Sequence, residues 1–372
     1  MPAISSCSGF RSVADEPGGR RPRILHIIPH DGVGGVEVAA RSMAERGDLD
    51  CDFTLLLLAG ETLAEDRSKV VTSPYRSALN PLAHLRAIRL CLRARPDVLV
   101  MSLWRSVGVG VLACLLSRRT RLVYFLNLDR PAHFVDAVAA RIAIACSDEV
   151  WGDSDATLAT RIGTRRKATR VISFVTERRT VPAALPGVRP HFVTWSRLNR
   201  QKGIDRALHF IATLRKSGID ATFDIWGPDD GERSLLEGLA KNLNIVDSVA
   251  FRGLAARETL PGIAAEAGFF LQLSRFEGMA MGTVEAMQLG LVPVVTPVGE
   301  MARYVQDELT GVVVDPDQLD QAAAKVAAVL HAPGAYGRLR AGAVRYWQEA
   351  RLYPEDVCAA ARDLVMRRGV RG

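Results

Sequence analysis

The stretch SRFEGMAMGTVEAMQLGLVPVVT, residues 274–296, decides how the second half of this chain folds. It follows an apolar run at 269–273 and turns through Glu277 and Gly278. Apolar residues then recur at helical spacing from Met281, and a second apolar run, VPVV, ends the stretch. This order predicts a strand, a loop, a helix and another strand, which is the repeating unit of a parallel sheet.

The same alternation extends to both sides of this stretch. Expected strands lie at residues 24–28, 53–58, 98–101, 122–126, 150–151, 191–195, 222–226, 249–251, 269–273, 292–295 and 311–314. Expected helices lie at residues 36–43, 82–95, 107–116, 133–145, 204–217, 232–242, 281–289, 319–330, 335–350 and 355–368. Short, nearly continuous apolar strands between helices indicate parallel sheets that are covered on both faces.

The chain divides where this alternation stops. Residues 1–22 are rich in Ser, Gly, Pro and charge, which predicts a disordered tail, and the proline-rich residues 177–190 predict a linker. Residues 23–176 and 191–350 then form two Rossmann-like domains, followed by a terminal helix within 351–372 that can pack back on the first domain. The predicted fold class is α/β, with two doubly wound parallel sheets whose carboxyl edges face a central cleft.

Composition excludes several classes of protein. The 372 residues are 48% hydrophobic and 24% charged, which is typical of a globular protein of about two domains. No apolar stretch reaches the roughly 18 residues that a membrane-spanning helix needs, and the N-terminal residues lack the apolar core of a signal peptide. Six scattered cysteines without a CxxC pair suggest neither a disulfide framework nor a zinc cluster. We therefore expect a cytoplasmic protein.

Positive charge is concentrated in the first half of the chain. The net charge is +7, and the whole excess of basic residues falls within residues 1–188. In the expected helix 82–95, Arg86, Arg89 and Arg93 share one face. Such a face can bind an anionic membrane or a phosphorylated ligand, and the alternative is an ordinary solvated surface.

Two acids flank the expected start of the helix at Met281. Free backbone N–H groups of Gly282 and Thr283 would favour an anion there, most simply a diphosphate. Glu277 and Glu285, eight positions apart, would repel a phosphate but would accept hydrogen bonds from sugar or ribose hydroxyls. The alternative is that both acids only stabilise the helix start.

This stretch resembles the signature of the retaining glycosyltransferases with the GT-B fold, specifically glycosyltransferase family 4, the glycosyl transferases group 1. The spacing Glu277-x7-Glu285, followed by Pro293 and Gly299, carries the resemblance. Further landmarks of the family stand in the expected order: Gly34-Gly35-Val36-Glu37, Ser196-Arg197-Leu198, Lys202-Gly203-Ile204-Asp205, Trp226-Gly227, Val249-x-Phe251-x-Gly253 and Thr310-Gly311. The resemblance spans about residues 23–320 and is stronger in the second domain.

The resemblance implies a role for each matching residue. Arg197 and Lys202 would clamp the diphosphate of a nucleotide-sugar donor, Glu277 would bind the donor sugar and Glu285 the ribose. Two cations and a helix N-terminus would offset the charge of the leaving group, so neither a metal nor a cofactor is expected. The full set of expected donor-binding residues is Gly34, Gly35, Gly227, Gly278, Met279, Gly282, Thr283 and Glu285.

The sequence departs from the family where many members carry a histidine, at the end of the fourth strand of the first domain. Asn127 stands there and cannot titrate, so a base at that position is in doubt. Asp129, His133, His30 and Asp31 are the possible replacements.

The resemblance implies a metal-independent hexosyltransferase that moves a sugar from a nucleoside diphosphate to an acceptor hydroxyl with retention. It implies a glycan or lipid-linked acceptor, a role in cell-envelope polysaccharide or glycolipid assembly, and a place on the inner face of the membrane. A catalytically silent nucleotide-binding protein, or a hydrolase or epimerase of nucleotide-sugars, are the alternatives. The loop Gly32-Val33-Gly34-Gly35 lacks the spacing of a dinucleotide-binding motif, and only charge would suggest nucleic acid.

Overall fold

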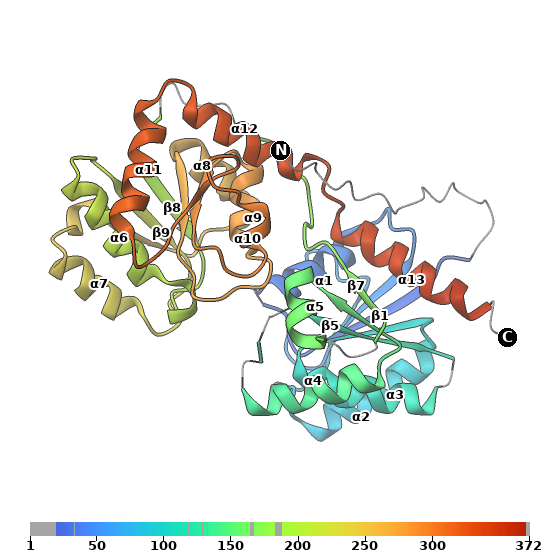
Figure 1. Cartoon of the computed structure of the whole chain (residues 1–372). Helices are drawn as coiled ribbons and strands as arrows, with labels where there is room; N and C mark the ends of the chain where they lie inside the picture. Colours follow the sequence, from blue (N-terminus) through green and yellow to red (C-terminus); the bar gives the residue numbers. More distant parts are fainter. Residues whose placement is uncertain are drawn as a thin grey trace.

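The computed structural model describes residues 20–32, 34–117, 119–127, 130–131, 133–163, 167–182 and 188–369, and these residues form two α/β lobes (Figure 1). Most of the expected tail and part of the expected linker, residues 183–187, lie outside the described residues.

The first domain is built on a seven-stranded parallel sheet in the order β3-β2-β1-β4-β5-β6-β7. Its strands are β1 (Arg23–Ile28), β2 (Asp52–Leu57), β3 (Val70–Val71), β4 (Val98–Ser102), β5 (Arg121–Leu126), β6 (Glu149–Gly152) and β7 (Thr169–Val171). Alternate strand residues pack on opposite faces, which explains the continuous apolar runs in the sequence. One face is covered by α1 (Gly35–Glu45), and the other by α2 (Pro81–Ala94), α3 (Trp104–Leu116), α4 (Phe134–Cys146) and α5 (Asp155–Ile162).

The second domain repeats the plan with a six-stranded parallel sheet in the order β10-β9-β8-β11-β12-β13. Its strands are β8 (His191–Trp195), β9 (Thr222–Trp226), β10 (Val249–Gly253), β11 (Phe269–Gln272), β12 (Val292–Val295) and β13 (Val312–Val313). One face is covered by α6 (Ile204–Lys216), α7 (Arg233–Asn242) and α11 (Leu319–His331), and the other by α8 (Leu260–Glu266), α9 (Met281–Gln288), α10 (Met301–Tyr304) and α12 (Ala335–Gln348).

Each sheet has a point where the connections change sides. In the first domain, β1 leads to α1 on one face and the neighbouring β4 leads to α3 on the other. In the second, β8 leads to α6 and the neighbouring β11 leads to α9 on the opposite face. The loops that leave such a pair of strands diverge and open a crevice at the carboxyl edge of the sheet, where α/β proteins bind ligands.

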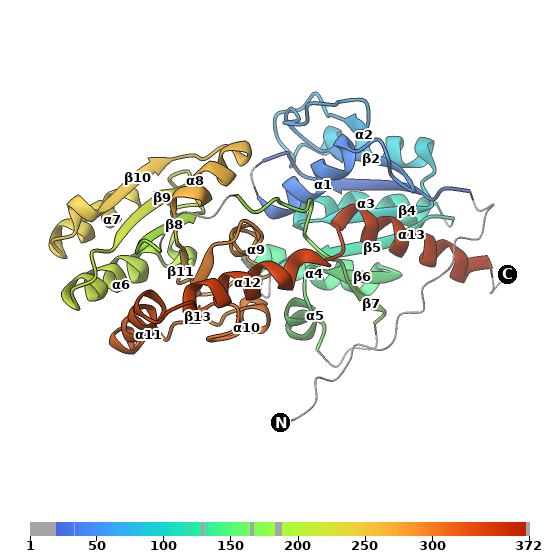
Figure 2. The ribbon, with the colours of Figure 1, turned by 90° about the horizontal axis from the view of Figure 1, so that it is seen from above.

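The last helix, α13 (Tyr353–Gly369), returns to the first domain and lies over its sheet (Figure 2). The Tyr353 N–H donates a 2.7 Å hydrogen bond to the Val175 carbonyl, so the two segments that cross between the domains lie together. Cys358 on α13 forms a disulfide with Cys51, which precedes β2. The expectation of no disulfide is therefore wrong: residues 307 positions apart come together, and local cysteine spacing cannot show this.

The predicted α/β class is confirmed, and the chain has the GT-B fold of two Rossmann-like domains. All eleven expected strands and all ten expected helices are present within a few residues. The strands β3 and β7 and the helices α5, α8 and α10 were not predicted; each is too short to show a clear period. Among the described residues, no helix combines the length and the apolar character that a membrane span requires.

Candidate functional site

The loops after β8 and β11 meet at the crevice of the second domain. Gly203 has a positive φ of 62°, and a Cβ there would lie 2.0 Å from the Leu273 carbonyl oxygen. Gly227, which follows β9, has a φ of 145°, and its Cβ would lie 1.7 Å from the Ser196 carbonyl oxygen. Only glycine permits these approaches. The two glycines therefore let the three loops close on one another.

Lys202 and Glu277 form the centre of this crevice. Oε1 of Glu277 accepts hydrogen bonds from Lys202 Nζ at 2.7 Å, Ser274 Oγ at 2.7 Å and Gln272 Nε2 at 2.9 Å. Its other oxygen, Oε2, accepts none from the part of the chain that the structure describes. Glu277 is only 4% exposed. Three donors hold one of its carboxylate oxygens, and the second oxygen can accept a hydrogen bond from a ligand.

Arg197 lies apart from this pair. Its side chain is 52% exposed, and Nη1 lies 3.3 Å from a carboxylate oxygen of Asp230 in the loop after β9. Lys202 and Glu277, two of the three residues of this domain expected to be catalytic, are therefore in contact, whereas the third, Arg197, is exposed and contacts Asp230.

The start of α9 differs in one detail from what the sequence predicts. Ala280 caps the helix in the left-handed region, with φ of 56°. The Thr283 N–H donates to the Ala280 carbonyl at 2.9 Å, so it is not free. The Gly282 N–H donates to no backbone carbonyl of the described chain, and a Cβ at Gly282 would lie 3.2 Å from the Trp195 carbonyl oxygen. The tight turn at Ala280 explains why only one of the two expected groups is available.

Glu285, one turn further along α9, is held by two arginines. Its Oε1 lies 3.3 Å from Arg179 Nη2 and 3.4 Å from Arg257 Nη2. Arg179 is only 7% exposed and belongs to the segment expected to be a linker, where no periodic pattern could reveal a site residue. Arg257 follows β10, and its Nη2 also donates to Thr176 Oγ1 at 2.6 Å.

The two domains touch beside Glu277. A Cβ at Gly278 would lie 2.5 Å from Asp153 Oδ2 and 2.8 Å from the Asn127 carbonyl oxygen, so the second domain rests here on the carboxyl edge of the first. Met279 follows, and its carbonyl accepts a 2.9 Å hydrogen bond from the Tyr304 hydroxyl.

The glycine loop of the first domain also reaches this contact. Gly35 lies against Met281 of α9 and against Phe174. A Cβ added at Gly35 would lie 3.9 Å from Met281 Cγ and 3.8 Å from Phe174 Cε1. Gly34 precedes it as the residue that caps α1.

Asp153, at the end of β6, was not predicted as a site residue. Burial raises its pKa to about 6, against the hydrogen bonds that it accepts from neighbouring hydroxyls, and the nearby Glu300 adds to the increase. Ser154 Oγ donates to its Oδ1 at 3.1 Å. Because the strand pattern ends before Asp153, only the contact between the domains shows its position.

The possible replacements for the family histidine have different positions. The Asp31 side chain is buried and is bound by Arg41 and by Thr62 Oγ1, so its carboxylate has a structural role. His133 caps α4 by accepting the Asp136 N–H. Asp129 lies outside the described residues. His30 is exposed and lines a cavity of the first domain.

A further histidine, His26, is buried in β1, and burial lowers its pKa to about 3. Its Nε2 lies 2.8 Å from Ser102 Oγ, which places it in the core. Among the described residues, no cluster of three or more His, Cys, Asp or Glu side chains could hold a metal ion.

Residues 178–345 match the family model "Glycosyl transferases group 1". The second domain belongs to the group 1 glycosyl transferases. The family that the Glu277-x7-Glu285 stretch predicts is therefore confirmed.

Among curated proteins, the chain is 28% identical over 203 residues to a GDP-mannose:cellobiosyl-diphosphopolyprenol alpha-mannosyltransferase of Komagataeibacter xylinus, covering 54% of this chain and 49% of that protein. It is 31% identical over 119 residues to the protein of the same description from Xanthomonas oryzae, covering 32% of this chain and 31% of that protein. The chain thus spans less than half of the length of each of these relatives.

Among solved structures, the chain is similar to Anabaena HepE, crystallised with UDP and glucose. The TM-score is 0.76 at 19% identity, over 94% of this chain and 100% of that chain. This likeness shows the GT-B fold across both domains.

Proposed function

We propose that this protein is a glycosyltransferase that moves a sugar from a nucleoside diphosphate to an acceptor hydroxyl, with retention and without a metal. The observation that carries the proposal is the Lys202–Glu277 pair at the crevice of a group 1 domain. The free Oε2 of Glu277 suits a sugar hydroxyl, since a carboxylate is a strong acceptor. Lys202 and the N-terminus of α9 would offset charge on the departing diphosphate.

The donor would lie mainly on the second domain, with Glu285 toward the ribose. Arg179 and Arg257 would hold the Glu285 carboxylate in place, since both contact the same oxygen and leave Oε2 to a ribose hydroxyl. Arg197 would contribute to the diphosphate clamp after leaving Asp230. No protein cofactor enters this scheme, because the nucleotide-sugar is itself a substrate.

The acceptor would bind on the first domain, and the relatives suggest its class. The K. xylinus and X. oryzae proteins are described as mannosyltransferases that act on a cellobiosyl-diphosphopolyprenol, which is a lipid-linked sugar. We therefore propose a glycan or lipid-linked acceptor, in cell-envelope polysaccharide or glycolipid assembly.

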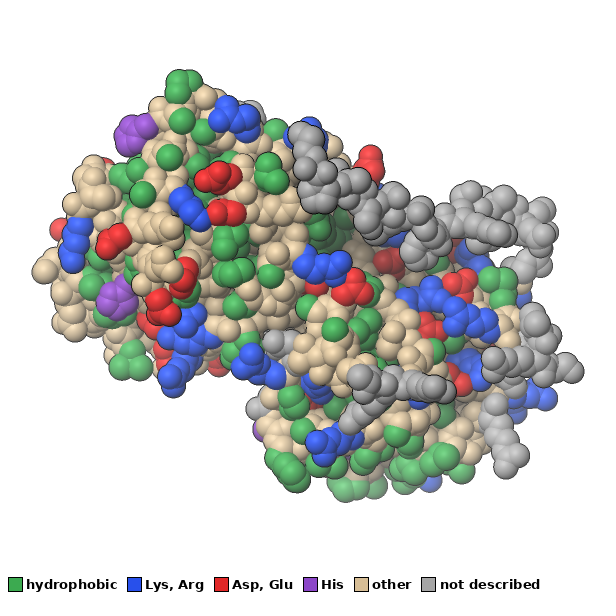
Figure 3. All heavy atoms as spheres, viewed as in Figure 1, with side chains coloured by type: hydrophobic (Ala, Val, Ile, Leu, Met, Phe, Trp, Pro, Cys, Tyr) green, Lys and Arg blue, Asp and Glu red, His purple; other side chains and the backbone are tan. Residues whose placement is uncertain are grey.

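A lipid-linked acceptor requires access to a membrane, and the first domain offers a surface for it. The helices α2, α3 and α4 pack side by side, and Figure 3 shows apolar side chains gathered at the lower edge of that domain. The exposed apolar residues on α3 and α4 are Leu112, Leu115, Leu116, Phe134, Val135, Val138 and Ile142. Arg86, Arg89 and Arg93 are exposed on the neighbouring α2. Apolar insertion together with basic residues favours an anionic bilayer, so we propose peripheral binding at the inner face of the cell membrane.

The test is a transfer assay with purified protein. Nucleoside diphosphates are first compared by thermal shift. The nucleotide-sugar of the one that binds is then supplied as donor, with membrane extract as the source of acceptor, in the presence of EDTA. Transfer that persists in EDTA is expected. Abolition by EDTA with rescue by Mn²⁺ or Mg²⁺ would contradict metal independence. Nucleotide binding without turnover would indicate a silent protein, and turnover without any acceptor would indicate a hydrolase or epimerase.

A further inference from the structure

A cavity of about 220 Å³ lies at the carboxyl edge of the first sheet, separate from the Lys202–Glu277 pair. Its wall combines the loop after β1, the loop after β2, the segment between β3 and α2, and the first turn of α3. Since β1 and β4 are the neighbouring strands whose helices lie on opposite faces, this is the crevice where α/β sheets bind ligands. The lining residues are His30, Ala59, Gly60, Arg76, Ser77, Ala78, Leu79 and Arg105.

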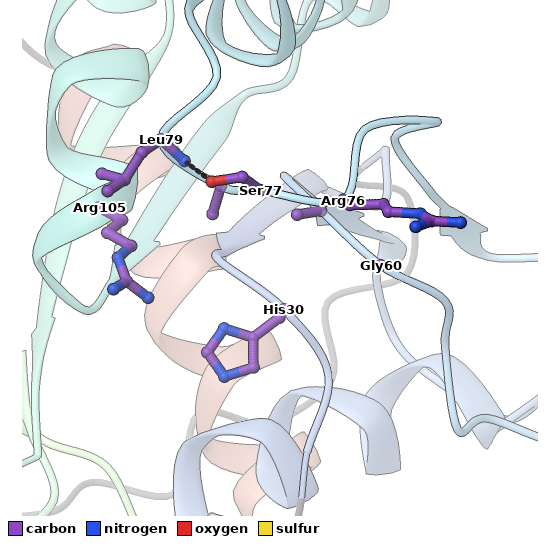
Figure 4. Close-up of a pocket in the computed structure, with 8 residues that line it drawn as sticks. His30, Gly60, Arg76, Ser77, Leu79 and Arg105 are labelled. Atoms are coloured by element: carbon purple, nitrogen blue, oxygen red, sulfur yellow. Dashed lines mark hydrogen bonds between the residues drawn. The ribbon is translucent and has the colours of Figure 1, made fainter.

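Arg105 and His30 point into this cavity from opposite sides, whereas the Arg76 side chain points away (Figure 4). The Arg105 guanidinium stacks 4.9 Å from the centre of the Trp104 ring, which limits its freedom. Its Nε is buried and has no hydrogen-bond partner among the described residues. A ligand in the cavity cannot reach this buried atom. The two terminal guanidinium nitrogens also form no hydrogen bond within the described residues, and they can donate to a ligand in the cavity.

No carboxylate lines the cavity to accept these hydrogen bonds. The side chain of Asp31, the neighbour of His30, is fully buried, and its two oxygens are taken by Arg41, Thr62 and the Leu63 N–H. Glu61, which follows Gly60, is exposed and does not contribute to the wall. The cavity therefore has an excess of positive charge and of hydrogen-bond donors.

The backbone supports the same conclusion. Arg105 stands in the first turn of α3, where the helix dipole disfavours a cation unless an anion is bound. Leu103, just before it, has φ of 63° and ψ of 150°, a conformation that side-chain-bearing residues rarely adopt and that clusters at functional sites. This turn keeps Arg105 at the edge of the sheet.

We propose that this cavity binds the phosphate group of a phosphorylated acceptor, with Arg105 and His30 as its donors. The assignment of the ligand as an acceptor rests on the proposed function, whereas the binding of a phosphate group does not. His30 stands in the same loop as Gly35, which contacts Met281 of the donor domain, so a phosphate here would anchor an acceptor on the side of the cleft that faces the donor. A guanidinium and a ring N–H beside a helix N-terminus suit a tetrahedral oxyanion.

The test is calorimetric titration of the full chain with inorganic pyrophosphate. Arg105→Gln and His30→Gln remove the two donors, and Lys202→Ala removes the donor clamp, which can also bind pyrophosphate. Arg345→Gln is the matched control, because Arg345 is exposed on α12. We expect Arg105→Gln to weaken one binding event by about tenfold or more, and Lys202→Ala to retain it. His30 is exposed, so its substitution tests the site without threatening the fold.

Two further arms distinguish the source of the phosphate. Methyl diphosphate carries a methyl ester on one terminal oxygen, as a phosphate that is linked to an acceptor would. It should bind to the wild type, and Arg105→Gln should weaken that binding. Binding of free pyrophosphate alone would overturn the acceptor assignment. Equal affinity of Arg105→Gln and wild type, or equal binding of acetate at matched ionic strength, would overturn the phosphate site. Nucleotide binding is measured in parallel, so its absence would count against the proposed function alone.

Discussion

Oδ2 of Asp153 would lie only 2.5 Å from a Cβ on Gly278, so a loop of the second domain rests on a buried carboxyl group of the first. The next residue toward the N-terminus is Glu277, whose carboxylate belongs to the candidate site. The contact between the domains and the proposed sugar contact therefore share one loop. A negative charge on Asp153 would act strongly on this contact, because Asp153 and Glu277 are both buried from water, which would otherwise screen it.

Asp153 gives a prediction about pH. Burial raises its pKa from an ordinary value of 3.8 to about 6. Between these values the unfolded chain loses the proton and the folded chain keeps it, so this group lowers folding stability as pH rises from about 4 to 6. Asp153→Asn should therefore gain up to about 3 kcal/mol over wild type at pH 7.5, and less toward pH 4. Urea unfolding at both pH values measures the difference.

Glu61→Gln is the control for that experiment, because Glu61 is exposed and its carboxylate forms no ion pair within the described residues. Its effect on stability should be small at both pH values. If Asp153→Asn changes the free energy of unfolding by the same amount at both pH values, the Asp153 carboxyl group does not titrate in this range.

The clamp on the diphosphate gives the second prediction. Lys202→Ala should lower turnover at least about a hundredfold, as does loss of a group that stabilises developing charge. Arg197→Ala should do the same if Arg197 leaves Asp230 when donor binds. Steady-state kinetics with Arg345→Gln as the control measures both. Loss in Lys202→Ala together with near wild-type turnover in Arg197→Ala would assign the clamp to Lys202 alone, and near wild-type turnover in both would remove it.

The third prediction concerns the surface of α2, α3 and α4. Binding to anionic vesicles should weaken steeply toward half-molar salt, where the Debye length falls to roughly 4 Å. Replacing Arg86, Arg89 and Arg93 by Gln should reduce binding at low salt, and Phe134→Ser should reduce the part that survives high salt. Phe134 is 82% exposed, so its substitution should leave the fold intact. Equal binding to neutral vesicles would contradict the role of the arginines, and no binding to anionic vesicles would return this surface to a solvated face.

The sequence predicted the fold well because buried parallel strands must be apolar on both faces, and this leaves a clear pattern at each strand. It also placed Lys202 and Glu277 in neighbouring loops, because both follow strands that end at one edge. Arg179 and Asp153 were missed for the opposite reason: tertiary contacts between segments far apart in sequence bring them to the site. The Thr283 N–H was wrongly expected to be free, since the unusual conformation of Ala280 closes a turn that no pattern indicates.

Cysteine chemistry gives the fourth prediction. The chain has six cysteines, and Cys51 pairs with Cys358. Thiol titration of the denatured, non-reduced protein should therefore find four thiols rather than six. Reduction, or Cys358→Ser, should lower stability by about 2–4 kcal/mol, because the bond closes a long loop between β2 and α13. Cys146→Ser is the control, as Cys146 is exposed and unpaired. Six reactive thiols would show that the pair is reduced in solution.

The two glutamates give the last prediction. If Glu285 accepts ribose hydroxyls, Glu285→Gln should weaken nucleoside diphosphate binding by about 1.5–3 kcal/mol, since a charge-assisted bond is lost. Glu277→Gln should change affinity for the free nucleotide much less, because its proposed partner is the sugar. Its effect should instead appear in turnover of the intact donor, where Oε2 would meet a hydroxyl. Calorimetric titration with the nucleoside diphosphate and with a non-transferable donor analogue separates the two roles.

The alternative is that both acids only stabilise the start of α9. Each substitution should then lower stability by about 0.3–1 kcal/mol and leave every ligand affinity unchanged. The structure already separates these cases for Glu277, because its Oε1 is held by Lys202, Ser274 and Gln272 rather than by the helix N-terminus. Glu277→Gln should therefore disturb Lys202 as well, and a nucleotide affinity that falls only in this variant would mean that Glu277 acts through Lys202 on the diphosphate. Equal small effects of both variants on all ligands would contradict the assigned roles.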